Sequence, residues 1–230
     1  FTSIAEQLDV DQVASLLQSH LTRVSKIIVQ HGGTLDKYIG DAIMAFWGAP
    51  IDDADQADHA LQAAIAMQKE CKQMRQELSA KGLPLISMRV GIHSGEAVVG
   101  NMGSDFLFDY TCIGDSVNLA ARLEGINKYY GTEIVLSDQS RQMLKVDTNL
   151  QLVDQVVVKG KSKPIAIFTV TESSIYNESN LAFSLYAEKK WDQAYKAYEA
   201  ILKQEPENAI AIYYLERIRY FTNNDPGKDW

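Results

Sequence analysis

Hydrophobic and polar residues follow two different periods along the first part of the chain. From 3 to 31, apolar residues recur every three or four positions, which predicts an amphipathic helix. The segments 34–39 and 42–47 are shorter and are bounded by turn residues, so they predict two strands. The pair Gly40-Asp41 between them predicts a tight hairpin turn.

The same periods predict the elements that follow. They are a helix from the acidic stretch 52–58 to about 80, strands at 86–93, 95–102 and 108–113, a helix over 115–129 capped by Asp115 or Ser116, a strand at 134–136, a helix at 137–144, and a hairpin of 150–159 and 165–170. With a first strand upstream of Phe1, this order would be βαββαβ plus additions. It predicts an α/β (α+β) fold, a ferredoxin-like sandwich with an extra C-terminal hairpin.

The segment 175–230 differs from what precedes it, because helical spacing replaces alternation. Its apolar positions are spaced like one tetratricopeptide-type repeat, and a further helix is expected over 209–221. A single repeat cannot bury its own apolar face. We therefore expect a small helical appendage, a helical hairpin packed on the preceding domain (1–172) or on a partner subunit, rather than a free peptide-binding module.

Composition narrows the class of protein. A formal charge of −8 with no dominant basic patch argues against nucleic-acid binding. The two cysteines, Cys71 and Cys112, lack metal-ligand spacing and predict free thiols in a reducing, cytoplasmic compartment. No apolar run reaches the roughly 18 residues of a membrane span. Because the first residue is Phe, we treat the chain as a fragment and leave room for an upstream sensory or membrane-tethering segment.

The candidate catalytic and binding residues lie in two similar stretches of sequence, LDKYIGDAIMAF (35–46) and DYTCIGDSVNLAARLEG (109–125). In each, a polar residue, Lys37 or Thr111, stands three positions before a Gly-Asp pair. Asn118 and Arg122 then follow four residues apart, on one face of the expected helix. A cation, a carboxylate, a hydroxyl, an amide and a guanidinium are the groups that a nucleoside triphosphate site needs.

These strings resemble those of class III nucleotidyl cyclases, the adenylyl and guanylyl cyclase family. The resemblance runs from residue 1 to about 171, and several strings occur in the family's order: FTSIAE (1–6), HGGTLDKYIGDAIMAFWGAP (31–50), RVGIHSGEAVVGNMG (89–103), the second string above, and VVVKGKSKPI (156–165). It implies the ferredoxin-like fold and a reaction that converts a nucleoside triphosphate into a 3′,5′-cyclic nucleotide and pyrophosphate.

The resemblance also assigns base recognition. In similar cyclases the positions of Lys37 and Thr111 choose the base: Lys with Asp or Thr goes with adenine, and Glu with Cys goes with guanine. This Lys/Thr pair therefore implies ATP as substrate and cyclic AMP as product. Cys112 lies one place from the guanine-selecting position, so we interpret it as a wall or backbone contact of the base.

The same resemblance implies which residues bind the metal ions and the phosphates. Asp41 corresponds to one of two carboxylates that hold two Mg²⁺ or Mn²⁺ ions per site, and the second is expected upstream of Phe1, outside this sequence. Phe1 and Thr2 open the phosphate-binding helix, and Lys159 corresponds to the lysine for the terminal phosphates. Asn118 would orient the ribose, and Arg122 would stabilise charge on the reacting phosphate.

The family shares each site between two catalytic domains packed head to tail. Because this chain holds residues of both halves, a homodimer is implied. Cyclases with Thr at the base-selecting position often respond to bicarbonate, so we also expect activation by bicarbonate.

The alternatives are a guanylyl cyclase and a catalytically silent dimerisation or regulatory module. At the residue level, Arg122 has a structural alternative as a surface residue paired with Glu124.

Overall fold

The computed structural model describes residues 4, 7–158, 163–172, 174–224 and 226–227. The elements are α2 (Val10–Gln30), β1 (Thr34–Ile39), β2 (Ala42–Phe46), α3 (Gln56–Ala80), β3 (Val90–Ile92), β4 (Val98–Gly103), β5 (Phe108–Ile113), α4 (Asp115–Tyr130), β6 (Ile134–Ser137), α5 (Asp138–Met143), β7 (Leu150–Val156), β8 (Ile165–Val170), α6 (Tyr176–Ala187), α7 (Trp191–Gln204) and α8 (Ala209–Asn223). The mixed α+β architecture that the sequence predicts is confirmed.

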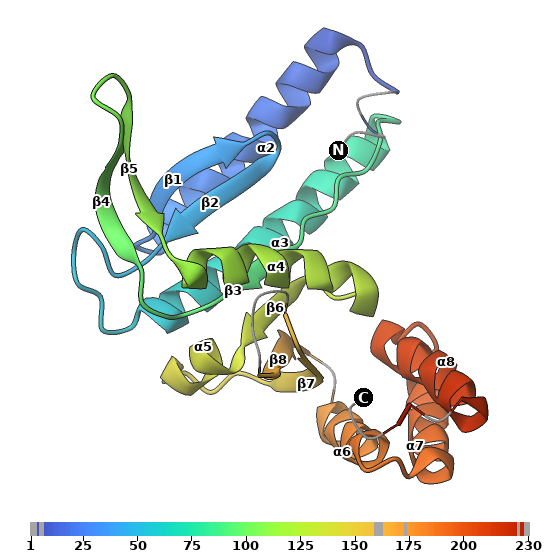
Figure 1. Ribbon diagram of the computed structural model, residues 1–230. Coiled ribbons are helices and arrows are strands. Elements are labelled where there is room, and N and C mark those ends of the chain that lie inside the picture. Colours follow the sequence, from blue (N-terminus) through green and yellow to red (C-terminus); the bar gives the residue numbers. More distant parts are fainter. Residues whose placement is uncertain (1–3, 5–6, 159–162, 173, 225, 228–230) are drawn as a thin grey trace.

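The described strands form three hydrogen-bonded groups. Strands β1 and β2 make one antiparallel hairpin and β4 and β5 another, while β3, β6, β8 and β7 form a mixed sheet in that order. The β3–β6 pair is parallel, and the chain between these strands includes helix α4. Figure 1 shows the β4–β5 hairpin projecting from the body, and α2 running behind the β1–β2 hairpin with α3 beside α2.

Helices α2 and α3 pack through apolar side chains and an ion pair. Val24 and Ile28 of α2 share a buried cluster with Leu61 and Met67 of α3. Farther along the same pair of helices, Arg23 lies 2.9 Å from Glu70 and 2.7 Å from Glu77. The two helices therefore form a firm support for the β1–β2 hairpin, whose apolar side chains pack against the same cluster.

Helix α2 begins later than the sequence predicts. Asp9 caps it, because the Asp9 carboxylate accepts a hydrogen bond from the Gln12 N–H at 2.8 Å and the Gln12 side chain accepts one from the Asp9 N–H at 3.2 Å. This reciprocal pair is a capping box, which fixes the first turn. A turn precedes it at residues 7–8, so the expectation of one continuous helix from Ser3 is wrong.

Two further boundaries differ from the expectation. The strand expected over 86–93 is formed at Val90–Ile92 alone, where the chain pairs with β6. The N-cap of α4 is Gly114, with no side-chain capping bond, and Asp115 is the first helical residue. The prediction that Asp115 or Ser116 caps this helix is therefore wrong, although an acid in the first turn still favours it.

The segment after β8 forms three helices, α6, α7 and α8, the last of them where a further helix was expected. Their buried side chains do not form a separate core, but join a cluster that includes Leu119 and Leu123 of α4 and Val153 of β7. The aromatic residues Tyr198 and Tyr214 stack at 5.0 Å within this cluster. The helices thus pack on the α+β domain of the same chain (Figure 1), and the expected helical hairpin that resembles one repeat stays a prediction.

Candidate nucleotide-binding site

The β1–β2 hairpin carries Lys37 on strand β1 and Asp41 at the turn between the two strands. Gly40 has φ of 64°, a left-handed conformation that suits glycine, and it places Asp41 at the exposed tip of the turn. The register shifts between Leu35 and Lys37, so Asp36 lies at a bulge. A bulge redirects side chains next to it, and here two consecutive charged residues both reach the neighbouring β5.

Asp36 is the centre of a buried polar cluster that the sequence did not reveal. Its side chain has 0% exposure. The Thr111 hydroxyl donates a hydrogen bond to Oδ2 of Asp36 at 2.6 Å, and the Cys112 backbone N–H donates to the same oxygen at 3.3 Å. The two base-recognition candidates, Lys37 and Thr111, are therefore brought together in one chain by a carboxylate between them.

Lys37 completes this cluster from the solvent side. Its ammonium lies 3.3 Å from Oδ1 of Asp36 and 3.6 Å from Oδ2 of Asp109, and its side chain is 37% exposed. The angle to Oδ1 of Asp36 is not that of a hydrogen bond, since this buried oxygen has no hydrogen-bond partner among the described residues. Lys37 is thus held electrostatically while its donors stay available to a ligand.

Cys112 is buried beside the same carboxylate. Burial, and to a smaller extent the negative charge of Asp36, raises the pKa of the Cys112 thiol. A protonated thiol is a weak donor and a poor nucleophile. Both the backbone N–H of Cys112, at 3.3 Å, and its thiol, at 4.0 Å, donate to Oδ2 of Asp36, and the expected contact of Cys112 with the base stays a prediction.

Helix α4 carries Asn118 and Arg122 and lies directly on β3. A Cβ on Gly91 would stand 2.2 Å from the Glu124 backbone nitrogen and 2.3 Å from the Ala120 carbonyl oxygen, so glycine alone permits this approach. Asn118 is exposed, and its amide donates to the Gly114 carbonyl oxygen at 3.3 Å. Asn118 and Arg122 therefore lie one turn apart on a helix whose position the strand fixes.

Arg122 does not form the surface ion pair that was its structural alternative. Glu124 instead accepts a hydrogen bond from Nε of Arg89 at 2.7 Å. Nη1 of Arg122 is buried and has no hydrogen-bond partner among the described residues. A buried guanidinium nitrogen without a partner costs free energy, so it is suited to an anionic ligand that would supply the missing acceptor.

Asp41 is an exposed carboxylate at its turn, and its charge acts on His20 of α2. Burial lowers the pKa of His20, and Asp41 opposes that effect by its charge. Within the described part of the chain, no group of three or more His, Cys, Asp and Glu residues could hold a metal ion. Asp41 fits one ligand position for Mg²⁺, which usually takes one or two carboxylates plus phosphate oxygens.

Comparison with known proteins agrees with this arrangement. Residues 1–172 match the sequence profile of the adenylate and guanylate cyclase catalytic domain. The chain belongs to this class III cyclase family. The resemblance that the motifs carry is thereby confirmed, while the Lys/Thr base-selecting subgroup stays a prediction.

The relatives of this cyclase domain include both adenylyl cyclases and a guanylyl cyclase. An adenylate cyclase of Anabaena cylindrica is 39% identical over 177 residues, 74% of this chain and 34% of that protein. The crystal structure of the adenylyl cyclase CyaB from P. aeruginosa superposes with a TM-score of 0.68 at 36% identity, covering 75% of this chain and 88% of that one. The guanylyl cyclase Cya2 gives a TM-score of 0.66 at 31% identity, covering 76% and 89%.

This cyclase domain spans only 34% of the Anabaena protein and 26% of another curated relative. Among the residues that the structure describes, no helix has the length and apolar character needed to cross a bilayer. The activity and partners of the whole protein are therefore matters for proposal.

Several predicted site residues are not joined within one chain of the cyclase. Figure 1 shows the β1–β2 turn, which carries Asp41, at the end of its hairpin that points away from helix α4. Phe1, Thr2 and Lys159 lie outside the described residues, so their assignment to the phosphates stays a prediction. The structure thus presents three groups: Asp41 at the β1–β2 turn, Lys37 and Thr111 around Asp36, and Asn118 and Arg122 on α4.

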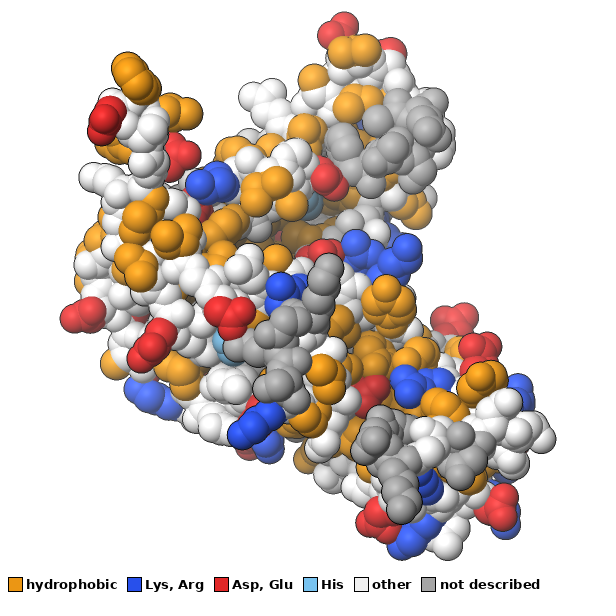
Figure 2. Space-filling view, viewed as in Figure 1, with side chains coloured by type: hydrophobic (Ala, Val, Ile, Leu, Met, Phe, Trp, Pro, Cys, Tyr) orange, Lys and Arg blue, Asp and Glu red, His pale blue; other side chains and the backbone are white. Residues whose placement is uncertain are grey.

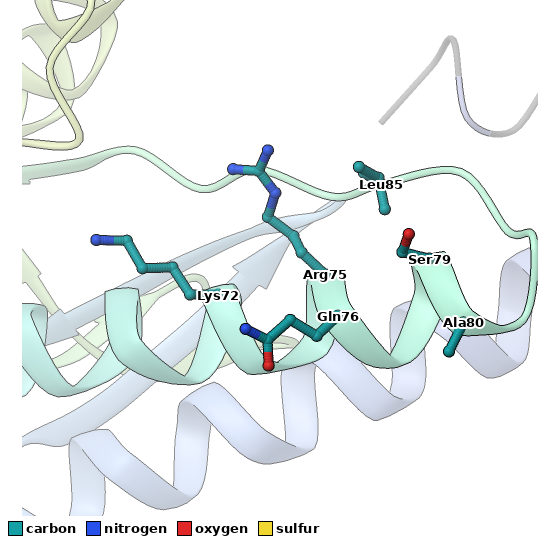
Figure 3. A pocket seen from close by; sticks show the side chains of 6 residues that line it. All are labelled: Lys72, Arg75, Gln76, Ser79, Ala80 and Leu85. Atoms are coloured by element: carbon teal, nitrogen blue, oxygen red, sulfur yellow. The ribbon is translucent and has the colours of Figure 1, made fainter.

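A surface hollow on the cyclase lies elsewhere. It is formed by α3 and the segment after it, and its lining side chains are Lys72, Arg75, Gln76, Ser79, Ala80 and Leu85 (Figure 3). None of them belongs to the predicted nucleotide site.

Asp36 is the residue that sequence reasoning missed. A signal was present, because Asp36 and Lys37 are adjacent charges inside a predicted strand. In a regular strand one of the two would face away from β5. The bulge, which the sequence does not predict, lets both side chains reach strand β5.

Proposed function

We propose that this cyclase domain is an adenylyl cyclase, which converts ATP into 3′,5′-cyclic AMP and pyrophosphate at sites shared in a head-to-tail homodimer. The observation that carries the proposal is the convergence of Lys37 and Thr111 on Asp36. It places an ammonium donor and a hydroxyl side by side, as recognition of the ring nitrogen and the 6-position of a purine requires.

The reaction is an intramolecular displacement. The ribose 3′-oxygen forms a bond to the α-phosphorus, the bond from that phosphorus to the bridging oxygen of the β-phosphate breaks, and the hydroxyl proton passes to solvent. Negative charge on the α-phosphate oxygens is stabilised by preorganised donors. The buried nitrogen of Arg122 that has no partner within the described ranges supplies one such donor, and Asn118, one turn earlier, orients the ribose.

Asp41 would hold Mg²⁺ or Mn²⁺ together with phosphate oxygens and a second carboxylate from outside this sequence. When bound, the metal ions lower the pKa of the 3′-hydroxyl and neutralise charge on the phosphates. The remaining work falls to groups that bind and orient the nucleotide, because no side chain of the described site needs to act as a general base.

The apolar surface of the β4–β5 hairpin supports a dimer. Phe106, Leu107 and Phe108 at its tip are 98%, 74% and 63% exposed, and Tyr110 and Ile113 extend the exposed surface along β5. Figure 2 shows this projecting hairpin with hydrophobic side chains at its tip. Exposed apolar groups that cluster in this way mark interaction sites, and a second copy of the chain is the partner that would also join the Asp41 turn to Asn118 and Arg122.

Two other functions each have one supporting observation. The similarity to the guanylyl cyclase Cya2 at 31% identity favours GTP as the substrate. The catalytically silent dimerisation or regulatory module has as its support that the second metal carboxylate is expected outside this sequence. Activation by bicarbonate stays a prediction that rests on Thr111.

The test is direct product analysis. Purified protein is incubated with Mg²⁺ or Mn²⁺ and with ATP or GTP in parallel, with and without bicarbonate, and the products are separated by chromatography. We expect cyclic AMP and pyrophosphate in equal amounts from ATP. Preferential formation of cyclic GMP would establish the guanylyl cyclase alternative, and no cyclic product with either metal would establish the silent module.

A further inference from the structure

We propose that Asp36 sets the direction of the Thr111 hydroxyl and thereby makes the site select adenine over guanine. The inference rests on the proposed function, because it takes Thr111 as the group that meets the 6-position of the purine. It assigns a specificity-determining role to a residue that would not itself touch the nucleotide.

The argument begins with the single proton of a threonine hydroxyl. A hydroxyl has one donor and two acceptor positions. In this structure, the Thr111 proton points to Oδ2 of Asp36 at 2.6 Å. A carboxylate accepts and does not donate, and hydrogen bonds to charged acceptors are the stronger ones. What the oxygen of Thr111 still offers to a ligand is a lone pair.

A lone pair distinguishes the two purines. The 6-position of adenine carries an amino group, which donates, and that of guanine carries a carbonyl oxygen, which accepts. An accepting Thr111 therefore binds the adenine amino group and repels the guanine oxygen. A freely rotating hydroxyl could instead turn its proton toward guanine and would accommodate both bases.

Several contacts hold Asp36 in the orientation that this mechanism needs. Its side chain has 0% exposure, Oδ2 also accepts from the Cys112 N–H at 3.3 Å, and Oδ1 lies 3.3 Å from the Lys37 ammonium. Thr111 itself is 7% exposed. Both partners are buried, and the hydrogen bond that directs the Thr111 proton is already present in the structure without a nucleotide.

The experiment compares variants by kcat/KM for ATP divided by kcat/KM for GTP. Asp36→Ala removes the acceptor and should lower this ratio at least about tenfold, the effect of one hydrogen bond to a charged group. The change should appear mainly in KM, because the base is distant from the reacting phosphorus. Asp36→Asn keeps an oxygen that can accept from Thr111 and the Cys112 N–H, so its ratio should stay within about threefold of the unmodified protein.

Asp109→Ala is the matched control. It removes the other carboxylate beside Lys37, 3.6 Å away, but leaves the bond between Asp36 and Thr111 intact, so the ratio should change less than about threefold. Thr111→Val should lower the ratio, and adding Asp36→Ala to it should lower the ratio no further, since Asp36 acts through the missing hydroxyl. If Asp36→Ala does not fold, as judged by circular dichroism, Asp36→Leu fills the same space without an acceptor and serves in its place.

The outcomes separate this inference from the proposed function. An unmodified protein that prefers GTP, or uses neither nucleotide, contradicts the proposed function and the inference with it. An unmodified protein that prefers ATP, together with an unchanged ratio in the Asp36 variants, contradicts the inference alone. The inference is also overturned if Asp36→Ala and Asp109→Ala lower the ratio equally, or if the effects of Asp36→Ala and Thr111→Val add, because charge near Lys37 would then explain them.

Discussion

Among the described residues, one buried guanidinium nitrogen of Arg122 has no hydrogen-bond partner. Glu124, two positions along the same helix, does not face Arg122 and instead pairs with Arg89 at 2.7 Å, so this nitrogen of Arg122 remains available. A buried charged donor without a partner destabilises the free protein, and it forms a strong hydrogen bond once an anionic group binds to it. The same reasoning applies to Lys37, which carboxylates hold in place without saturating its donors.

Replacement of Arg122 should therefore separate catalysis from stability. We expect Arg122→Ala to lower kcat about 10²–10³-fold, the effect of one lost donor to a charged transition state, and Asn118→Ala to lower it through misorientation of the ribose. Nucleotide binding should weaken far less. The melting temperature of Arg122→Ala should not fall, because the variant removes an unpaired group.

Arg89→Ala provides the control for this prediction. It removes a guanidinium from the same region but breaks only a partly exposed ion pair with Glu124, worth about 0–1 kcal/mol, so turnover should be nearly unaffected. Steady-state kinetics and nucleotide titrations of the purified variants make the comparison. Ordinary turnover in both Arg122→Ala and Asn118→Ala would refute their assigned roles.

At the scale of elements, helix α8 is joined to the edge strand β7 by a buried polar contact. The Tyr214 hydroxyl donates to the Val153 carbonyl oxygen at 2.7 Å, where the register of β7 shifts between Leu152 and Asp154. Tyr130 of α4 donates to Asp154, and Arg217 of α8 lies 3.9 Å from the same carboxylate. Burial, and next the charge of Asp154, raises the pKa of the Tyr130 hydroxyl far above its usual range, so it remains a donor.

Tyr214→Phe tests whether the appended helices and the α+β domain are one folded unit. The substitution leaves the buried Val153 carbonyl oxygen without this donor, which should cost about 1–3 kcal/mol and lower the melting temperature by several degrees. Tyr220→Phe on the same helix is the control, since Tyr220 is 62% exposed and a change there should stay within about 0.5 kcal/mol. Thermal unfolding followed by circular dichroism should show a single transition, and equal effects of the two variants would contradict the shared core.

At the scale of the whole molecule, the predicted catalytic groups lie on separate parts of the chain. Asp41 is at an exposed turn, and Asn118 and Arg122 are on α4. The exposed apolar tip of the β4–β5 hairpin adds a surface suited to a second copy. A head-to-tail pair explains all three observations, and in it each site would take its metal carboxylates from one subunit and its helix α4 residues from the other.

Mixing two inactive variants tests this arrangement. Asp41→Ala and Arg122→Ala homodimers should each have two defective sites. In the mixed dimer both defects fall in one site and the other is intact, so an equimolar mixture should regain about a quarter of the unmodified activity if subunits exchange at random. Differently tagged chains allow the mixed dimer to be isolated, and a verified mixed dimer without activity would reject the shared site.

Sequence and structure contributed differently to the elements and the site. The order of helices and strands followed from hydrophobic period and from turn residues such as Gly40, which act over short distances. The corrections concern helix starts: the capping box of Asp9 sets the start of α2, and α4 follows Gly114 without a side-chain capping bond. For the site, the motifs identified Lys37 and Thr111, but not the carboxylate that joins them.

The sequence by itself determined the class of the domain, because spaced motifs and local periodicity are properties of adjacent residues. Only the tertiary structure decided that Asp36 faces Thr111, that Glu124 pairs with Arg89 and leaves Arg122 free of it, and that α6, α7 and α8 share a core with α4 and β7. Each of these contacts joins residues whose approach depends on a bulge, on close helix–strand packing or on burial. These are consequences of the folded chain as a whole, and no local pattern of residue types encodes them.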